Sequence, residues 1–135
     1  MQPDPQQEGR RWLDQALRDM DDARLVRDSG RFNLACFLCQ QAAEKALKGL
    51  LFLLGEEFVR GHSVGDLCKQ AAALEPAFAA LCEAAARLDL FYIPTRYPNG
   101  LPGGLPSEAF VADDADRALE LASAIIGEVE RAFSL

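Results

Sequence analysis

The fold of this chain is decided by residues 32–54, which read FNLACFLCQQAAEKALKGLLFLL. Drawn as a helix, the stretch is apolar over nearly its whole circumference. One face follows the three-to-four spacing of a helix through Phe32, Cys36, Cys39, Ala43, Ala46, Leu47, Leu50 and Leu54, while Leu34, Phe37, Leu38, Leu51 and Phe52 fill much of the other side. A helix that is apolar nearly all round must be covered nearly all round. We therefore expect it to be the buried central helix of a bundle.

The polar residues of this stretch form one narrow strip. They lie three and four positions apart, and they are Gln40, Gln41, Glu44, Lys45 and Lys48. Glu44 precedes Lys48 by four residues, which is the favourable order for such a pair on a helix. Two lysines and a glutamate in mid-segment are costly in hydrocarbon, so the pattern excludes a membrane span.

The composition indicates one acidic domain, residues 1–135. A net charge of −7 argues against loose binding to nucleic acid, because attraction to phosphate requires a positive face. The N-terminal residues, MQPDPQQEGR, lack the basic-then-apolar order of a secretory signal. We expect a cytoplasmic protein with no membrane partner, in which any contact with nucleic acid is a local basic patch.

Two groups of residues raise the question of a metal site. Cys36 and Cys39 form a CxxC inside the expected central helix, but the other two cysteines do not form a second pair, and the chain has one histidine. Buried cysteine behaves as a small hydrophobe, which is the interpretation we favour. The first helix carries Asp14, Asp19, Asp21 and Asp22, which we expect to lie mostly outward as a solvated acidic face. No cofactor or metal is expected.

The remaining sequence predicts an all-α fold, an antiparallel up-and-down bundle of four to five helices. Gly30 ends a first helix that begins near Glu8, and Ser63 with Asp66 forms a cap for a third helix. Pro76 suits the first turn of a fourth helix. The expected ranges besides the central helix are residues 8–28, 64–74, 77–91 and 111–133. Prolines at every fourth position between Tyr92 and Pro106 exclude helix there and predict a loop.

Three motifs follow one another along the chain. Gln40 to Lys48 reads QQAAEKALK after a helix of the WLDQALRDMDDA kind, and Gly61-His62-Ser63 and then Arg96-Tyr97-Pro98 follow. In kind and order these motifs resemble the HEPN family of small helical proteins, from about residue 10 to residue 133. The resemblance implies a helical bundle that commonly forms a homodimer. It also implies an association with minimal nucleotidyltransferase domains, with toxin–antitoxin pairs or with RNA cleavage.

Topology predicts where the polar loops meet. If successive helices are antiparallel, the loop after the second helix and the loop after the fourth helix lie at the same end of the bundle, together with Arg10 and Arg11. Helix N-termini and arginines together bind anions, and the third and last helices both begin at that end. The sequence therefore predicts a phosphate or nucleotide site, and its residues are Arg60, His62, Tyr92, Arg96 and Tyr97.

A purely structural role for these residues stays open at this point. His62 directly precedes a helix cap and could simply hydrogen-bond the loop. Arg96 could pair with an aspartate such as Asp113 to pin the long loop. The two tyrosines could pack over the end of the bundle.

The resemblance alone does not select an activity. HEPN ribonucleases share an arginine followed four to six residues later by a histidine, a pair that steadies phosphate charge and moves a proton. Here Arg96 is followed by YPNGLPGG, and Arg60 is too close to His62 for that spacing. We therefore expect an accessory or interaction protein that works with a nucleotidyltransferase. A metal-independent ribonuclease with a composite site of Arg96 and His62, or with one shared across a dimer, is the alternative.

Overall fold

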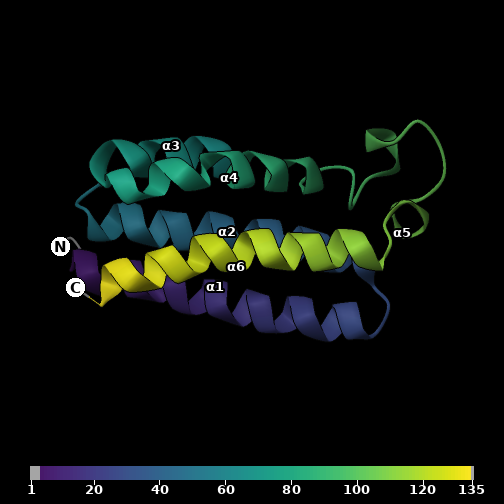
Figure 1. Cartoon of the computed structure of the whole chain (residues 1–135), viewed down its shortest axis with the longest axis horizontal. Helices are drawn as coiled ribbons and strands as arrows, with labels where there is room; N and C mark the ends of the chain where they lie inside the picture. The colour runs from purple at the N-terminus through teal and green to yellow at the C-terminus, as the bar shows by residue number, and fades with distance from the viewer. Residues whose placement is uncertain (1–3, 135) are drawn as a thin grey trace.

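The computed structural model describes residues 4–134 and contains helices but no strand in that range, so the all-α prediction is confirmed. The elements are α1 (Pro5–Asp28), α2 (Phe32–Leu53), α3 (Val64–Leu74), η1 (Pro76–Leu81), α4 (Cys82–Leu88), η2 (Asp89–Phe91), η3 (Pro98–Gly100), α5 (Pro106–Ala109) and α6 (Ala112–Phe133), where η marks a 3-10 helix. The long helices α1, α2 and α6 run along the molecule, and α3 with α4 form a further row beside them (Figure 1).

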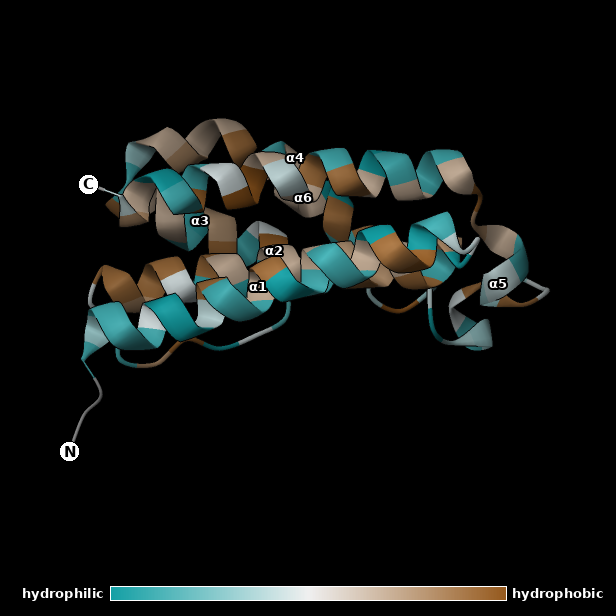
Figure 2. Cartoon of the chain, turned by 90° about the horizontal axis from the view of Figure 1, so that it is seen from below, coloured by the Kyte–Doolittle hydropathy of each residue, from teal (hydrophilic) through white to brown (hydrophobic). Residues whose placement is uncertain are grey.

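Helix α2 is the centre of the bundle, as its composition predicts. Thirteen of its residues are buried, and α1, α6 and α3 all pack against it. Polar residues line the outward surface of α1, while apolar residues mark α2 behind it (Figure 2). In the part of the chain that the structure describes, none of the helices has the length and apolar character that crossing a membrane requires.

The helix boundaries follow from local caps. Helix α1 begins at Pro5, earlier than expected, because the Asp4 carboxylate accepts a hydrogen bond from the Gln7 amide at 3.0 Å and proline suits a first turn. Ser63 caps α3 as predicted, its hydroxyl accepting from the Asp66 amide at 3.1 Å. The last helix starts one residue later than expected, with Val111 as its N-cap.

Two predicted segments differ in detail. The fourth helix is divided into η1, α4 and η2, so only Cys82–Leu88 is α-helical. The stretch from Tyr92 to Pro106, expected to contain no helix, forms the single turn η3 and leads into the short helix α5. Both of these elements start at a proline, whose missing N–H is no loss in a first turn.

Helix α3 runs in the same direction as α2, so our assumption that successive helices alternate is wrong for this pair. Gln40 donates to the His62 carbonyl at 2.8 Å, which places the start of α3 beside the middle of α2. Helix α4 is antiparallel to α3 and ends near the start of α2, where the Tyr92 and Phe37 rings are 6.4 Å apart. Because α3 starts beside the middle of α2, residues 54–63 must fold back along α2 from its end. At 1.5 Å per residue, the 11 residues of α3 then span half the length of the 22 residues of α2.

Asp19 also differs from expectation. It does not lie outward with the other aspartates of α1, because it is only 5% exposed and its carboxylate is 2.6 Å from the Lys45 ammonium of α2. Gln15 donates a second hydrogen bond to it at 2.8 Å. A buried carboxylate needs such partners, and the one available cation lies on the neighbouring helix.

Candidate functional site

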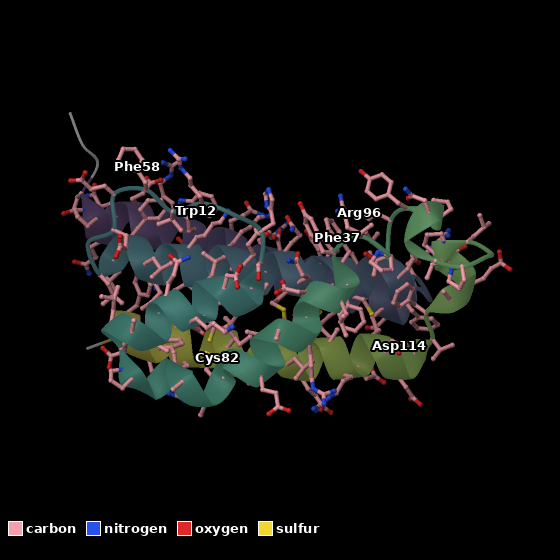
Figure 3. The ribbon with its side chains drawn as sticks, turned by 90° about the horizontal axis from the view of Figure 1, so that it is seen from above. Trp12, Phe37, Phe58, Cys82, Arg96 and Asp114 are labelled. Atoms are coloured by element: carbon pink, nitrogen blue, oxygen red, sulfur yellow. The ribbon has the colours of Figure 1, made fainter. Side chains whose placement is uncertain are left out.

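Arg96 lies among aromatic rings on the surface of the bundle. The carbon at the centre of its guanidinium is 4.3 Å from the ring centre of Phe37, 4.7 Å from that of Tyr92 and 4.9 Å from that of Tyr97. Its Nε donates to the Tyr92 carbonyl at 2.9 Å. Within residues 4–134 no carboxylate forms an ion pair with it, so the pairing with Asp113 that we considered does not occur. Arg96 and Phe37 lie side by side in Figure 3.

The loop that carries Arg96 is anchored from both sides. The carbonyl of Thr95 accepts a hydrogen bond from the Asn33 amide at 3.0 Å, which ties the loop to the first turn of α2. The Thr95 hydroxyl donates to the Phe91 carbonyl, and the whole residue is 1% exposed. Gly100 packs so closely on Pro94 that an added Cβ would be 3.0 Å from the Pro94 Cα. The guanidinium is therefore presented from an ordered backbone.

His62 lies against the same tyrosine. Its ring stacks on the Tyr92 ring with centres 5.4 Å apart and an angle of 17° between the planes. Its Nδ1 is 3.3 Å from Oε1 of Glu44, while 62% of its side chain is exposed. The imidazole is thus held at one edge and open to solvent elsewhere.

The N-terminus of α3 is already occupied by a protein carboxylate, which corrects one argument for the site. The Asp89 carboxylate accepts from the amides of Val64 at 2.7 Å and Gly65 at 3.0 Å, and from the Ser63 hydroxyl at 2.8 Å. At α6 the backbone amide of Val111 donates to the carboxylate of Asp114. These donors satisfy protein carboxylates, and they are not offered to a ligand.

The structure thus brings together four of the five predicted site residues. The His62 ring stacks on the Tyr92 ring, and the Arg96 guanidinium lies against the rings of Tyr92, Tyr97 and Phe37. We refer to Phe37, His62, Tyr92, Arg96 and Tyr97 as the Arg96 cluster. Arg60 is exposed two residues before His62, and none of the hydrogen bonds or cation–π contacts described within residues 4–134 joins it to the cluster.

Arg10 and Arg11 do not belong to the site. Helix α1 begins at the end of the bundle where α2 and α6 finish, because Gly9 packs against Gly49 and Phe133. The Arg96 cluster lies toward the other end, beside the first turns of α2. The sequence also did not single out Phe37, Glu44 or Asp89 as parts of the site, since their partners are 18 or more residues away along the chain.

Three of the four cysteines, Cys36, Cys39 and Cys68, are buried thiols, and Cys82 is half-buried. Burial raises the pKa of Cys36, Cys39 and Cys68 to about 12, and the nearby Cys36 adds to the effect at Cys39. Thiols with such pKa values are poor nucleophiles and poor metal ligands near neutral pH. Among the described residues, no three His, Cys, Asp or Glu side chains are grouped so that they could hold a metal ion.

Comparison with known proteins identifies the fold and its family. The model of the HEPN domain matches residues 10–132 of this sequence. The chain belongs to the HEPN family. The crystal structure of TT1696 from Thermus thermophilus is 40% identical, with a TM-score of 0.84 over 92% of this chain and 97% of that one.

Two solved structures that are named as HEPN proteins are similar over almost the same range. ST0689, an archaeal HEPN homologue, is 37% identical, with a TM-score of 0.77 over 93% of this chain and 98% of that chain. An HEPN domain protein of Thermotoga maritima is 30% identical, with a TM-score of 0.72 over 92% of this chain and 98% of its own. A search of curated proteins finds no match. The resemblance read from the sequence motifs is confirmed.

Proposed function

We propose that this HEPN protein binds a nucleotide through the Arg96 cluster and acts as an interaction protein beside a separately encoded nucleotidyltransferase. The observation that carries the proposal is the placement of Arg96. Its guanidinium packs against three aromatic rings, while its Nε is engaged by the Tyr92 carbonyl. The two terminal nitrogens can then donate in parallel to one phosphate group.

The surroundings of Arg96 favour a nucleotide over a bare anion. Tyr97 is 48% exposed and His62 is open to solvent, so flat aromatic surfaces flank the arginine. A nucleobase stacks on such rings, and base–aromatic stacking is worth about 1–3 kcal/mol. The chain as a whole carries a net charge of −7, and the guanidinium of Arg96, which pairs with no carboxylate of residues 4–134, places positive charge on this acidic molecule.

Calorimetric titration with AMP, ATP, GTP and inorganic phosphate tests the proposal. We expect nucleotides to bind and Arg96→Ala to lose at least ten-fold in affinity, because hydrogen bonds to a charged group contribute about 1.5–3 kcal/mol. Arg96→Lys should also weaken binding, since an ammonium cannot form two parallel bonds or stack as a plane. Arg117→Ala is the matched control, because Arg117 is an exposed arginine of α6 that pairs with Glu120 at 3.0 Å. Absence of heat with every ligand would refute the proposal.

The partners form a second part of the proposal. Exposed apolar side chains flank the cluster, namely Leu34, Leu90 and Ile93, which are 39%, 70% and 42% exposed. Large apolar side chains exposed in this region support a homodimer. Sedimentation should give twice the mass of 14.8 kDa, and Leu90→Glu with Ile93→Glu should lower it to that value. A nucleotidyltransferase that copurifies with the tagged protein from native cells would support the partnership, and repeated purification without one would count against it.

One observation favours ribonuclease activity as the second candidate. Arg96 and His62 both contact the Tyr92 ring. A phosphate-binding group and a proton-transfer group could therefore act on one substrate, although the spacing of arginine and histidine in the sequence differs from that of the ribonucleases. Incubation of the pure protein with structured RNA in EDTA tests this. Cleavage that disappears in both Arg96→Ala and His62→Ala would establish the composite site, and intact RNA would exclude it.

A further inference from the structure

The central helix buries a charged pair that its packing does not require. Glu44 and Lys48 are 4% and 7% exposed, and their charged atoms are 3.3 Å apart. Burying two charges costs several kcal/mol each, and apolar side chains of similar size often leave a protein equally stable or more stable. A pair of this kind therefore needs another explanation than stability.

The nearest exposed group that the pair contacts is the imidazole of His62. Its Nδ1 lies 3.3 Å from one carboxylate oxygen of Glu44 and 3.4 Å from the other. On an imidazole the second nitrogen points away from the first, so Nε2 faces away from α2. No hydrogen bond to Nε2 comes from residues 4–134. The carboxylate of Glu44 thus holds one edge of the imidazole ring, and the rest of the ring is exposed.

The backbone on both sides of His62 is held as well. Gln40, which is fully buried, donates to the His62 carbonyl at 2.8 Å, and its own side-chain oxygen accepts from Gln41 at 2.9 Å. Asp89 binds the next three residues through Ser63, Val64 and Gly65. Buried side chains of α2 and the half-buried Asp89 of η2 therefore fix a single exposed imidazole, which is the arrangement by which proteins preorganise a functional group.

We infer that Glu44 is a positioning residue that holds His62 with Nδ1–H directed at its carboxylate, leaving Nε2 as a hydrogen-bond acceptor for the bound nucleotide. The inference rests on the proposed function, because it names the role of His62 at the same cluster. Arg96 supplies only donors, and they suit phosphate. A neutral Nε2 supplies an acceptor instead, which suits a donor group of the ligand such as a sugar hydroxyl. Lys48 pairs with the Glu44 carboxylate at 3.3 Å and holds it in place.

The single histidine makes the tautomer directly measurable. In protein labelled with ¹⁵N-histidine, each imidazole nitrogen signal belongs to His62, since the chain contains one histidine. Across pH 6 to 9 we expect the neutral ring to show a protonated Nδ1 and an unprotonated Nε2. A neutral ring protonated at Nε2 in the wild type would overturn the inference without reference to any ligand.

The double variant Glu44→Met with Lys48→Met separates positioning from stability. Removing both partners avoids an unpaired buried charge, so we expect unchanged or higher resistance to urea. We also expect loss of the fixed tautomer and about ten-fold weaker binding of AMP. Removal of a pair with a purely structural role would not weaken AMP binding while leaving the resistance to urea unchanged or higher. The matched control is Asp19→Val with Lys45→Met, which removes the ion pair that joins α1 to α2 at 2.6 Å without touching His62.

Every outcome has a meaning. AMP affinity of the Glu44→Met, Lys48→Met variant equal to wild type overturns the inference while leaving the proposed function standing. Wild type that binds none of AMP, ATP, GTP and inorganic phosphate overturns both. The acceptor role is tested by 2′-deoxy-AMP and 3′-deoxy-AMP. At least one of them should bind the wild type more weakly than AMP does. The same ligand should bind His62→Phe as well as AMP binds that variant. Equal binding of all three by the wild type would exclude a sugar hydroxyl as the donor and refute that assignment.

Discussion

Replacing Gly49 by alanine should destabilise the protein, although alanine is a far better helix former than glycine. In an open helix interior the change gains about 1 kcal/mol. At Gly49 an added Cβ would lie 2.7 Å from the Gly9 carbonyl oxygen, 3.1 Å from the Trp12 Cβ and 3.3 Å from the Leu13 amide nitrogen. Two of these atoms belong to the backbone of α1 and cannot rotate away, so the two helices must move apart.

The size of the effect follows from these opposing contributions. Overpacking a well-filled interior costs about 1–3 kcal/mol, and a contact with rigid backbone belongs in the upper half of that range. After the gain in helix propensity, we expect a net loss of about 1–2 kcal/mol for Gly49→Ala. Urea unfolding followed by far-UV circular dichroism, at one fixed protein concentration, measures this change as a lower midpoint at an unchanged slope.

Gly127→Ala makes the same chemical change at a position where nothing lies within 4 Å of the added Cβ. Here the propensity gain stands alone, and we expect about 0.5–1 kcal/mol of stabilisation. The two variants should therefore shift the midpoint in opposite directions. If Gly49→Ala is as stable as Gly127→Ala, the close approach of α1 and α2 at Gly9 and Gly49 is not as described.

Three further predictions concern the charges and thiols. Asp89→Ala should destabilise the protein by about 1–2 kcal/mol, since it leaves the first amides of α3 unsatisfied, and urea midpoints would reveal it. The hydrogen bond and charge of Arg27 lower the pKa of Asp116, so this pair stabilises the fold above the ordinary aspartate value of 3.8 and loses that effect as the pH falls through the lowered pKa. Asp116→Asn should thus be less stable than wild type at pH 7, and the difference should shrink as the pH falls through that lowered pKa. With pKa values of about 12 against 9.0, Cys36, Cys39 and Cys68 should react with an aromatic disulfide reagent about a thousand-fold more slowly in the native protein than in urea.

The features predicted correctly from sequence are those that depend on neighbours along the chain. The periodicity of residues 32–54 identified the central helix, and Ser63 with Asp66 identified the start of α3, because a helical face and a cap are both decided within a few residues. The expected start of α1 lies three residues too late, although the cap residue Asp4 and the first-turn Pro5 that set the true start are also neighbours in the sequence. The division of residues 76–91 into 3-10 and α-helical parts has no comparable signal in the sequence.

The features that sequence could not supply depend on partners far apart in the chain. Asp19 resembles its outward neighbours until Lys45, 26 residues later, is placed opposite it. Asp89 resembles an ordinary exposed acid until its carboxylate is seen on the amides of Val64 and Gly65. In each case a side chain of ordinary type acquires its role from a contact that only the tertiary structure creates.

The Arg96 cluster shows how residues expected to lie together can do so by a different path of the chain. We expected the loops of His62 and Arg96 to meet because helices alternate in direction, yet they meet because α3 starts beside the middle of α2 and runs in the same direction as α2. Residues 54–63 must then return along α2, and the polar strip of that helix decides where they stop. Gln40 holds the His62 carbonyl and Glu44 its ring, which places His62 against Tyr92. The strip that seemed only to interrupt an apolar helix is therefore what assembles the site.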